Sequence, residues 1–270
     1  MEDQVIRAAH HAMATPWELL IYHPSLEEAE AAANEAWARV DALEALLSRF
    51  KPDSDLARIA NAARETTIPI ATETVQCLEL ALAVKSETAG AFDIRLMRSG
   101  DGSDPPQTPT PLATGELFSL DPHLETVTVH EDSVKLDLGG IGKGYAIDEL
   151  VPLLADWDIK HALINAGKST LYAMGHPPEE EAWPVSAGPN PDELYPLTQQ
   201  ALSGSGFGVQ GVHVHDPRTG MPLVTNRHNA WVFADSAALA DALSTAVLVM
   251  SDGEIDAFHE KHPEIAIMIA

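Results

Sequence analysis

The stretch ALINAGKST (residues 162–170) ends like a phosphate-binding P-loop, and its interpretation decides between two fold classes. A P-loop needs a glycine five residues before the glycine of its Gly-Lys pair, but Ala162 occupies that position. The residues between are mostly apolar and favour an extended strand. The sequence that follows, TLYAMG, is rich in strand formers and offers no amphipathic helix to hold phosphate. We therefore predict a tight turn between two strands rather than a nucleotide-binding loop.

The elements expected around this turn form a mixed α+β chain. The sequence lacks an internal repeat and a regular βαβ series, which disfavours a doubly wound fold. A Pro-, Gly- and Ser-rich loop is expected over about 100–115. Apolar spacing predicts strands at 17–22, 161–166, around 211–216 and at 265–270. It also predicts a hairpin over 126–138 with its turn at 130–133. Helices are expected from a Ser25–Glu28 capping box to about Arg49, over about 71–90, after Gly144, and from Ser236 to about Met250, with a further short helix after Met250.

Composition limits the classes of partner. The 270 residues include 41 acidic and 16 basic side chains, a formal charge of −25, so a nucleic-acid backbone would be repelled. An anionic ligand would need local positive charge from a metal or a placed lysine or arginine. Cys77, the single cysteine, excludes an intrachain disulfide and a multi-cysteine metal site. A buried structural thiol is favoured over a nucleophile there.

The sequence shows neither a transmembrane segment nor a secretory signal. Its apolar runs fall short of the ~20 residues that cross a bilayer. The N-terminus has no basic region followed by an apolar region and a cleavage site. We expect a cytoplasmic protein as the sequence is written, with a periplasmic or membrane-anchored location as the alternative if a leader has been removed.

Four segments carry candidate chemistry. DLGGIGKGYAID (137–148) places glycines and Lys143 before a helix, which suits an anion but also suits an ordinary structural turn. HVHDPRTGMP (213–222) is a turn that follows two histidines on one strand face, without a third zinc ligand at a telling spacing. In ADALSTAV (240–247), Asp241 and Thr245 share a helix face and suit Mg²⁺, although a structural role is favoured from this segment alone. SETAGAFDIRL (86–96) could fix a loop over a ligand.

Together these segments resemble the ApbE family, the FAD:protein FMN transferases. Seven elements stand in the family's order over nearly the whole chain. They are MAT (13–15) for the family's MGT, SDLARI (54–59), TAGAFD (88–93), DLGGIGKGYAID (137–148), NAG (165–167), HVHDPRTG (213–220) and ADALSTA (240–246).

The resemblance implies a single α+β domain over 1–270, with a mixed or antiparallel sheet packed by helices. It implies that FMN passes from FAD to a threonine or serine of an acceptor flavoprotein, with Mg²⁺ bound and AMP released. The roles that it implies are as follows: Mg²⁺ ligands Asp241, Thr245 and the backbone carbonyl near Gly142; catalytic His213, with Asp216 holding the turn or assisting it; and an FAD site with Met13, Thr15, Phe92, Asp93, Gly140, Lys143, Gly144, Gly167 and Lys168.

Departures from the family's pattern leave two alternatives open. Ala14 replaces the glycine of MGT, and Lys168 replaces a glycine in the family's NAGGD element. Lys168 could clash with FAD or supply a cation to its phosphates. The alternatives are an FAD-binding protein that has lost transfer, and a hydrolase that splits FAD into FMN and AMP.

Overall fold

The stretch 162–170 forms two antiparallel strands joined by a short turn. β6 (His161–Ala166) pairs with β7 (Thr170–Met174), and Ala166 lies opposite Thr170. The three residues between them turn the chain, with positive φ angles of 66° at Gly167 and 62° at Lys168. A strand follows the turn where a P-loop would have a helix, so the prediction from the sequence is confirmed.

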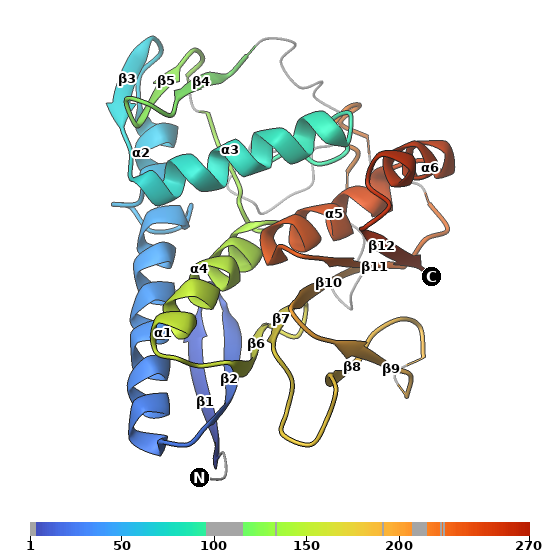
Figure 1. Cartoon of the computed structure of the whole chain (residues 1–270). Helices are drawn as coiled ribbons and strands as arrows, with labels where there is room; N and C mark the ends of the chain where they lie inside the picture. Colours follow the sequence, from blue (N-terminus) through green and yellow to red (C-terminus); the bar gives the residue numbers. More distant parts are fainter. Residues whose placement is uncertain are drawn as a thin grey trace.

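This hairpin lies at the centre of a seven-stranded antiparallel sheet (Figure 1). The structure is a computed structural model that describes residues 4–95, 116–132, 134–190, 192–206, 215–221, 223 and 225–270. The sheet has the strand order β1-β2-β6-β7-β10-β11-β12. Its other strands are β1 (Gln4–Ala12), β2 (Thr15–His23), β10 (Gln200–Gly206), β11 (Asn229–Ala234) and β12 (Ala266–Ile269).

Helices cover one face of the sheet, and α3 lies across two of them (Figure 1). α1 packs on β1 and β2, α4 on β6 and β7, and α5 on β10 and β11. The apolar side chains between these helices and the sheet form the main core. The helices are α1 (Leu26–Leu47), α2 (Asp55–Asn61), α3 (Thr72–Glu87), α4 (Gly142–Asp156), α5 (Ala237–Val249) and α6 (Asp252–Lys261).

Two smaller sheets complete the described structure. The first has the order β3-β5-β4, and the second pairs β8 with β9. Trp183 and Leu197 of the second sheet pack with Leu202 and Phe233, and so cover the large sheet on the face away from the helices. The strands are β3 (Thr66–Pro69), β4 (Phe118–Asp121), β5 (Thr126–Val129), β8 (Trp183–Ser186) and β9 (Leu194–Leu197).

Helix α5 is the central helix of the fold. Eleven of its 13 residues are buried, including the polar residues Asp241 and Ser244, so α5 lies inside the core although one side of it is polar. Its first turn is capped by Ser236, whose hydroxyl accepts from the Leu239 amide, and by Asp148 of α4, which accepts from the Ala237 and Ala238 amides at 2.7 and 2.9 Å. The α4 carboxylate therefore fixes where α5 begins.

Most of the expected elements are confirmed. The strand at 17–22 lies within β2, and the long helices begin and end close to their predicted limits, with Ser25 capping α1. The second half of the Ser25–Glu28 capping box differs, because the Glu28 carboxylate lies 3.8 Å from Nδ1 of His23 instead. The α+β class with an antiparallel sheet is also confirmed.

The predicted hairpin at 130–133 is wrong. β5 pairs with β4, which precedes it, and with β3. The turn of that hairpin follows Asp121, whose side chain accepts from the amides of His123 and Leu124 at 3.0 and 3.1 Å. This Asp-Pro turn outcompetes the later polar residues, because an aspartate that bonds the following amides stabilises a reversal.

Some elements differ from the expected ones, and some of the expected elements fall on residues that the structure does not describe. The helix expected after Gly144 begins at Gly142. The elements that were not foreseen are α2, β1, β3, β4, β8, β9, β10 and β11. The loop expected over 100–115 and most of the strand expected around 211–216 lie outside the described residues. In the described part of the chain, we find no helix long and apolar enough to cross a membrane.

Cys77 is a structural thiol, as expected. Its side chain is fully buried in the main core. Burial, with the negative charge of Asp241, raises the pKa of the Cys77 thiol to about 12. A thiol with such a pKa is not a nucleophile at neutral pH.

Gly144 allows α4 and α5 to approach closely, which gives a test of the fold. A Cβ atom added to Gly144 would lie 2.2 Å from the backbone oxygen of Ala237. We expect Gly144→Ala to lower the free energy of unfolding by about 3 kcal/mol or more, because neither backbone can yield easily. Urea denaturation measures this change.

The control is Gly253→Ala in α6, where an added Cβ meets no atom within 4 Å. This substitution should raise the free energy of unfolding by about 0.5–1 kcal/mol, since alanine favours a helix over glycine. Equal effects of the two substitutions would contradict the close approach of α4 and α5.

Candidate active site

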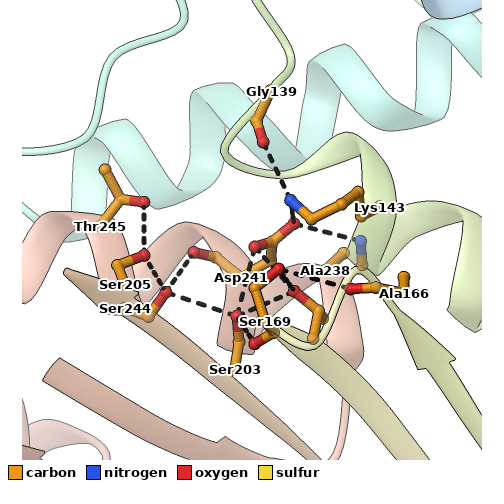
Figure 2. Close-up of polar contacts among 12 residues, drawn as sticks. Gly139, Lys143, Ala166, Ser169, Ser203, Ser205, Ala238, Asp241, Ser244 and Thr245 are labelled. Carbon is orange, nitrogen blue, oxygen red and sulfur yellow. Dashed lines mark hydrogen bonds and ion pairs between the residues drawn. The ribbon is translucent and has the colours of Figure 1, made fainter. Parts of the chain in front are cut away.

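The buried carboxylate of Asp241 is the centre of the candidate site (Figure 2). Asp241 lies on α5 and is 3% exposed. Its Oδ1 accepts from the hydroxyls of Thr170 and Ser203 at 3.0 and 3.2 Å. Its Oδ2 accepts from the Gly144 amide at 3.2 Å and from the Lys143 ammonium at 3.3 Å. One carboxylate oxygen therefore faces neutral hydroxyls, and the other faces a cation.

A chain of hydroxyls links Asp241 to Thr245, one turn further along α5. Thr170 and Ser203 lie opposite each other on β7 and β10, with 3.0 Å between their hydroxyls. Ser205 follows on the same face of β10 and lies 2.7 Å from the hydroxyl of Ser244 and 3.2 Å from that of Thr245. The sheet register thus presents a row of hydroxyls to the polar side of α5.

The Gly-rich loop 137–144 closes over this row from the other side. The Gly139 carbonyl accepts from the Lys143 ammonium at 3.2 Å (Figure 2). A Cβ atom on Gly140 would lie 3.5 Å from the Thr245 hydroxyl and 3.3 Å from the Phe92 ring. The loop therefore meets both Asp241 and Thr245, with its backbone close to each.

The oxygens that meet here are of the type that hard cations bind. A carboxylate, a hydroxyl and a backbone carbonyl are ligands that suit Mg²⁺. Among the described residues, no three His, Cys, Asp or Glu side chains group as a transition-metal site would require. The carbonyl expected near Gly142 has a neighbour to compare: the Gly139 carbonyl accepts from the Lys143 ammonium, which also pairs with Asp241. Gly142 itself is the first residue of α4. The donor set fits a hard cation and does not fit zinc.

A pocket opens beside the loop. It has a volume of about 180 Å³ and is lined by the β1–β2 turn, the end of α1 and the Gly-rich loop, including Met13, Ala14, Phe50, Gly142 and Lys143. The Met13 amide donates to the Glu44 carboxylate at 2.8 Å, which ties the turn to α1. A pocket of this size admits only part of a molecule as large as FAD.

The two hairpin turns of the large sheet meet next to this pocket. Met13 and Ala14 form a two-residue turn, with φ angles of 50° and 57°. A Cβ atom on Gly167 would lie 2.1 Å from the Thr15 hydroxyl, so Gly167 is needed where the turns touch. Lys168 follows with its side chain exposed, and in the described part of the chain it has no ion-pair partner. The structure therefore brings Met13, Thr15, Gly167 and Lys168 to one end of the sheet.

Phe92 lies against Gly140 of the Gly-rich loop, and neither Phe92 nor Asp93 lines the pocket. Phe92 is 4% exposed. The Asp93 side chain is 2% exposed and forms ion pairs with Lys85 at 3.0 Å and Arg95 at 2.5 Å. Phe92 therefore packs against the loop, and Asp93 holds the segment that follows α3 through Lys85 and Arg95. Direct contact of either residue with FAD stays a prediction.

Asp216 holds the DPRTG turn together. Its carboxylate accepts from the Arg218 guanidinium at 2.9 Å through each oxygen, and Arg218 also pairs with Glu254 of α6 at 2.5 Å. Burial opposes ionisation, but hydrogen bonds from Arg218 keep the pKa of Asp216 below its ordinary value. Of the two roles open for Asp216, these contacts favour holding the turn. His213 lies outside the described residues.

Comparisons with known proteins place this chain in a family. The model of the ApbE family matches residues 13–269. This chain belongs to the ApbE family. The FAD:protein FMN transferase of Klebsiella pneumoniae is 28% identical over 88% of this chain and 76% of its own length.

Solved structures share the fold. The flavinyl transferase ApbE of Pseudomonas stutzeri has a TM-score of 0.85 at 21% identity, covering 100% of this chain and 93% of its own. The flavin transferase ApbE of Vibrio cholerae has a TM-score of 0.86 at 21% identity, covering 99% of this chain and 93% of its own. The ApbE fold is therefore retained over the chain, including the sheet and helices that hold Asp241.

The hydroxyls around Asp241 in this ApbE protein were not predicted from the sequence. Thr170, Ser203 and Ser205 are distant from Asp241 in sequence, Ser244 lies three residues after it, and none stands out alone. The available signal was the run SGSG at 203–206, where two serines fall on one face of a strand. Polar residues on the helix-covered face of a strand need partners, and α5 supplies them.

The Asp216–Arg218 pair predicts a pH dependence of stability. The folded pKa of Asp216 is lowered, so the pair stabilises the fold above the ordinary value of about 3.9 and this contribution is lost as pH falls. The pKa of Glu254 is also lowered, by hydrogen bonds from Ser251 and by Arg218, while burial opposes the shift. Arg218→Met should reduce stability near neutral pH by about 1–3 kcal/mol. It should also reduce the fall in the free energy of unfolding as the pH is lowered.

Urea denaturation at a series of pH values from neutral to about 2.5 measures both effects. The control is Arg64→Met, which removes an exposed arginine whose carboxylate partner Glu65 is also exposed. If the free energy of unfolding of Arg218→Met falls with decreasing pH as steeply as that of the unsubstituted protein, the pair does not stabilise the turn.

Proposed function

We propose that this protein transfers FMN from FAD to a threonine or serine hydroxyl of an acceptor flavoprotein, with Mg²⁺ bound and AMP released. The observation that carries the proposal is the buried Asp241 carboxylate, which meets a cation and a backbone carbonyl where the Gly-rich loop lines a pocket. Membership of the ApbE family and the names of the relatives support it.

The reaction joins an acceptor oxygen to a phosphorus atom of FAD. The P–O bond to the AMP portion breaks, AMP leaves with the bonding electron pair, and the hydroxyl loses its proton. Asp241, Thr245 and the loop carbonyl near Gly142 or Gly139 would hold Mg²⁺. Bound there, Mg²⁺ would neutralise the charge of the diphosphate. We assign His213 the role of accepting the hydroxyl proton, because imidazole titrates near neutral pH.

The chain's own cations would orient the diphosphate. Its formal charge of −25 would otherwise repel an anion. Lys143 lines the pocket and Lys168 is exposed beside the turns that meet next to it. The exposed Lys168 can approach a phosphate directly, whereas Lys143 is paired with Asp241 at 3.3 Å and Arg49 with Asp137 at 3.2 Å. The turn residues Met13, Thr15 and Gly167 and the backbone at Gly140 and Gly144 would shape the rest of the FAD site.

The metal role of Asp241 has a direct test. The protein is incubated with FAD, Mg²⁺ and an acceptor flavoprotein, and intact mass is measured for an FMN adduct. We expect Asp241→Ala to slow adduct formation by about 100-fold or more, because a metal ligand is lost. Thr245→Val should slow it by about tenfold or more. Asp256→Ala, which changes an exposed residue of α6, serves as the matched control.

Product analysis separates the alternatives. FAD binding without AMP release at any Mg²⁺ concentration would indicate a flavin-binding protein without transfer. AMP and free FMN formed in the absence of acceptor would indicate a hydrolase. An unchanged rate in Asp241→Ala, with FAD binding retained, would refute the metal role.

Lys168 has a second test, which measures FAD affinity by flavin fluorescence. Lys168→Ala should weaken FAD binding by about three- to tenfold, because one cation near a phosphate is lost. Lys160→Ala is the control, since the Lys160 side chain is 70% exposed and pairs with exposed Asp158. Tighter binding by Lys168→Ala would instead show that this lysine obstructs FAD.

A further inference from the structure

The Lys143 ammonium lies beside the Asp241 carboxylate, at the position where a metal ion bound to that carboxylate would lie. This ammonium lies 3.3 Å from Oδ2 of Asp241 and 3.2 Å from the Gly139 carbonyl. Figure 2 shows the ammonium between these two oxygens. We propose that Lys143 fills the cation position of the metal-free protein, and that a divalent metal displaces this ammonium into the pocket. This inference rests on the metal site proposed above.

The burial of Asp241 explains why a cation must remain. Its side chain is 5% exposed, and a carboxylate so far from water needs compensation. Thr170 and Ser203 donate to Oδ1 but carry no charge. Among the described residues, Lys143 is the cation that pairs with Asp241. Without a metal, the Lys143 ammonium is the positive charge that lies against this carboxylate.

The lysine and a metal compete for the same oxygen. Mg²⁺ binds oxygen at about 2.0–2.1 Å and requires close to octahedral geometry. The Gly144 amide already donates to Oδ2. A divalent ion on Oδ2 would face the ammonium at short range, and like charges repel strongly where water is sparse. The two cations therefore exclude each other at Oδ2.

The displaced ammonium has a defined destination. Lys143 lines the pocket, and its side chain is 18% exposed, so its flexible stem has an open side. Metal binding would thus add a second positive charge to the pocket. By linkage, an anion that pairs with the released ammonium would in turn strengthen metal binding.

Mn²⁺ binding in the absence of FAD tests this exchange. Free Mn²⁺ is measured by electron paramagnetic resonance for the unsubstituted protein, Lys143→Met and Lys160→Met. If the ammonium fills the position for at least about 80% of the time, its removal should tighten Mn²⁺ binding by about fivefold or more. Lys160→Met removes the same charge from an exposed position and should change the affinity by less than about twofold.

A second measurement follows the lysine itself. Brief acetylation, read by mass spectrometry, should modify Lys143 slowly without metal and several-fold faster with saturating Mn²⁺. Lys160 should react at the same rate in both conditions. Asp241→Asn should raise the Lys143 rate without metal, because its anionic partner is lost.

The outcomes distinguish the exchange from the proposed function. Mn²⁺ binding that depends on Asp241, but is no tighter in Lys143→Met, would overturn the exchange and leave the proposed function intact. A Lys143 labelling rate that Mn²⁺ does not change would overturn it equally. If Asp241→Asn binds Mn²⁺ as well as the unsubstituted protein does, or if neither binds it, both the exchange and the metal role in transfer would be overturned.

Discussion

The carboxylate of Asp241, buried in the core between α5 and the sheet, sets the main constraint on this structure. Burial of a charge is costly unless hydrogen bonds and an opposite charge compensate for it. The compensating groups come from β7, β10 and the start of α4, through Thr170, Ser203, Gly144 and Lys143. Three elements must therefore reach their native positions before the carboxylate of a fourth is satisfied.

Small residues make that convergence possible. Gly144 lets α4 approach the first turn of α5, and Asp148, one turn later, caps the same turn. Burial raises the pKa of Asp148 despite the hydrogen bonds from Ala238, Ser236 and Ala237. The contact between α4 and α5 thus contains two carboxylates with different tasks, the half-buried Asp148 and the buried Asp241. Asp148 fixes the start of the helix, and Asp241 faces the loop.

Local rules predicted much of the fold. The turn at 167–169, the Ser25 cap and the limits of α5 follow from residues close together in sequence. The shared helix face of Asp241 and Thr245 also follows from their spacing of four. The pairing of β5 with β4 was not predicted, because it depends on which of two polar segments turns the chain.

The surroundings of Asp241 could not be read from local sequence. Thr170 and Ser203 lie 71 and 38 residues from Asp241, and only the register of β7 and β10 brings their hydroxyls together. The Arg218–Glu254 ion pair likewise joins residues 36 positions apart, and only the fold brings them together. Family resemblance identified which segments meet, whereas the structure shows which atoms do.

Anomalous diffraction from crystals grown with Mn²⁺ tests the central claim most directly. The account predicts a single anomalous peak within about 2.0–2.4 Å of an Asp241 carboxylate oxygen, with the Thr245 hydroxyl and a carbonyl of the Gly-rich loop nearby. It also predicts that Lys143 no longer contacts that oxygen. A peak elsewhere, or a Lys143 ammonium still bound to Asp241 at saturating Mn²⁺, would contradict the account.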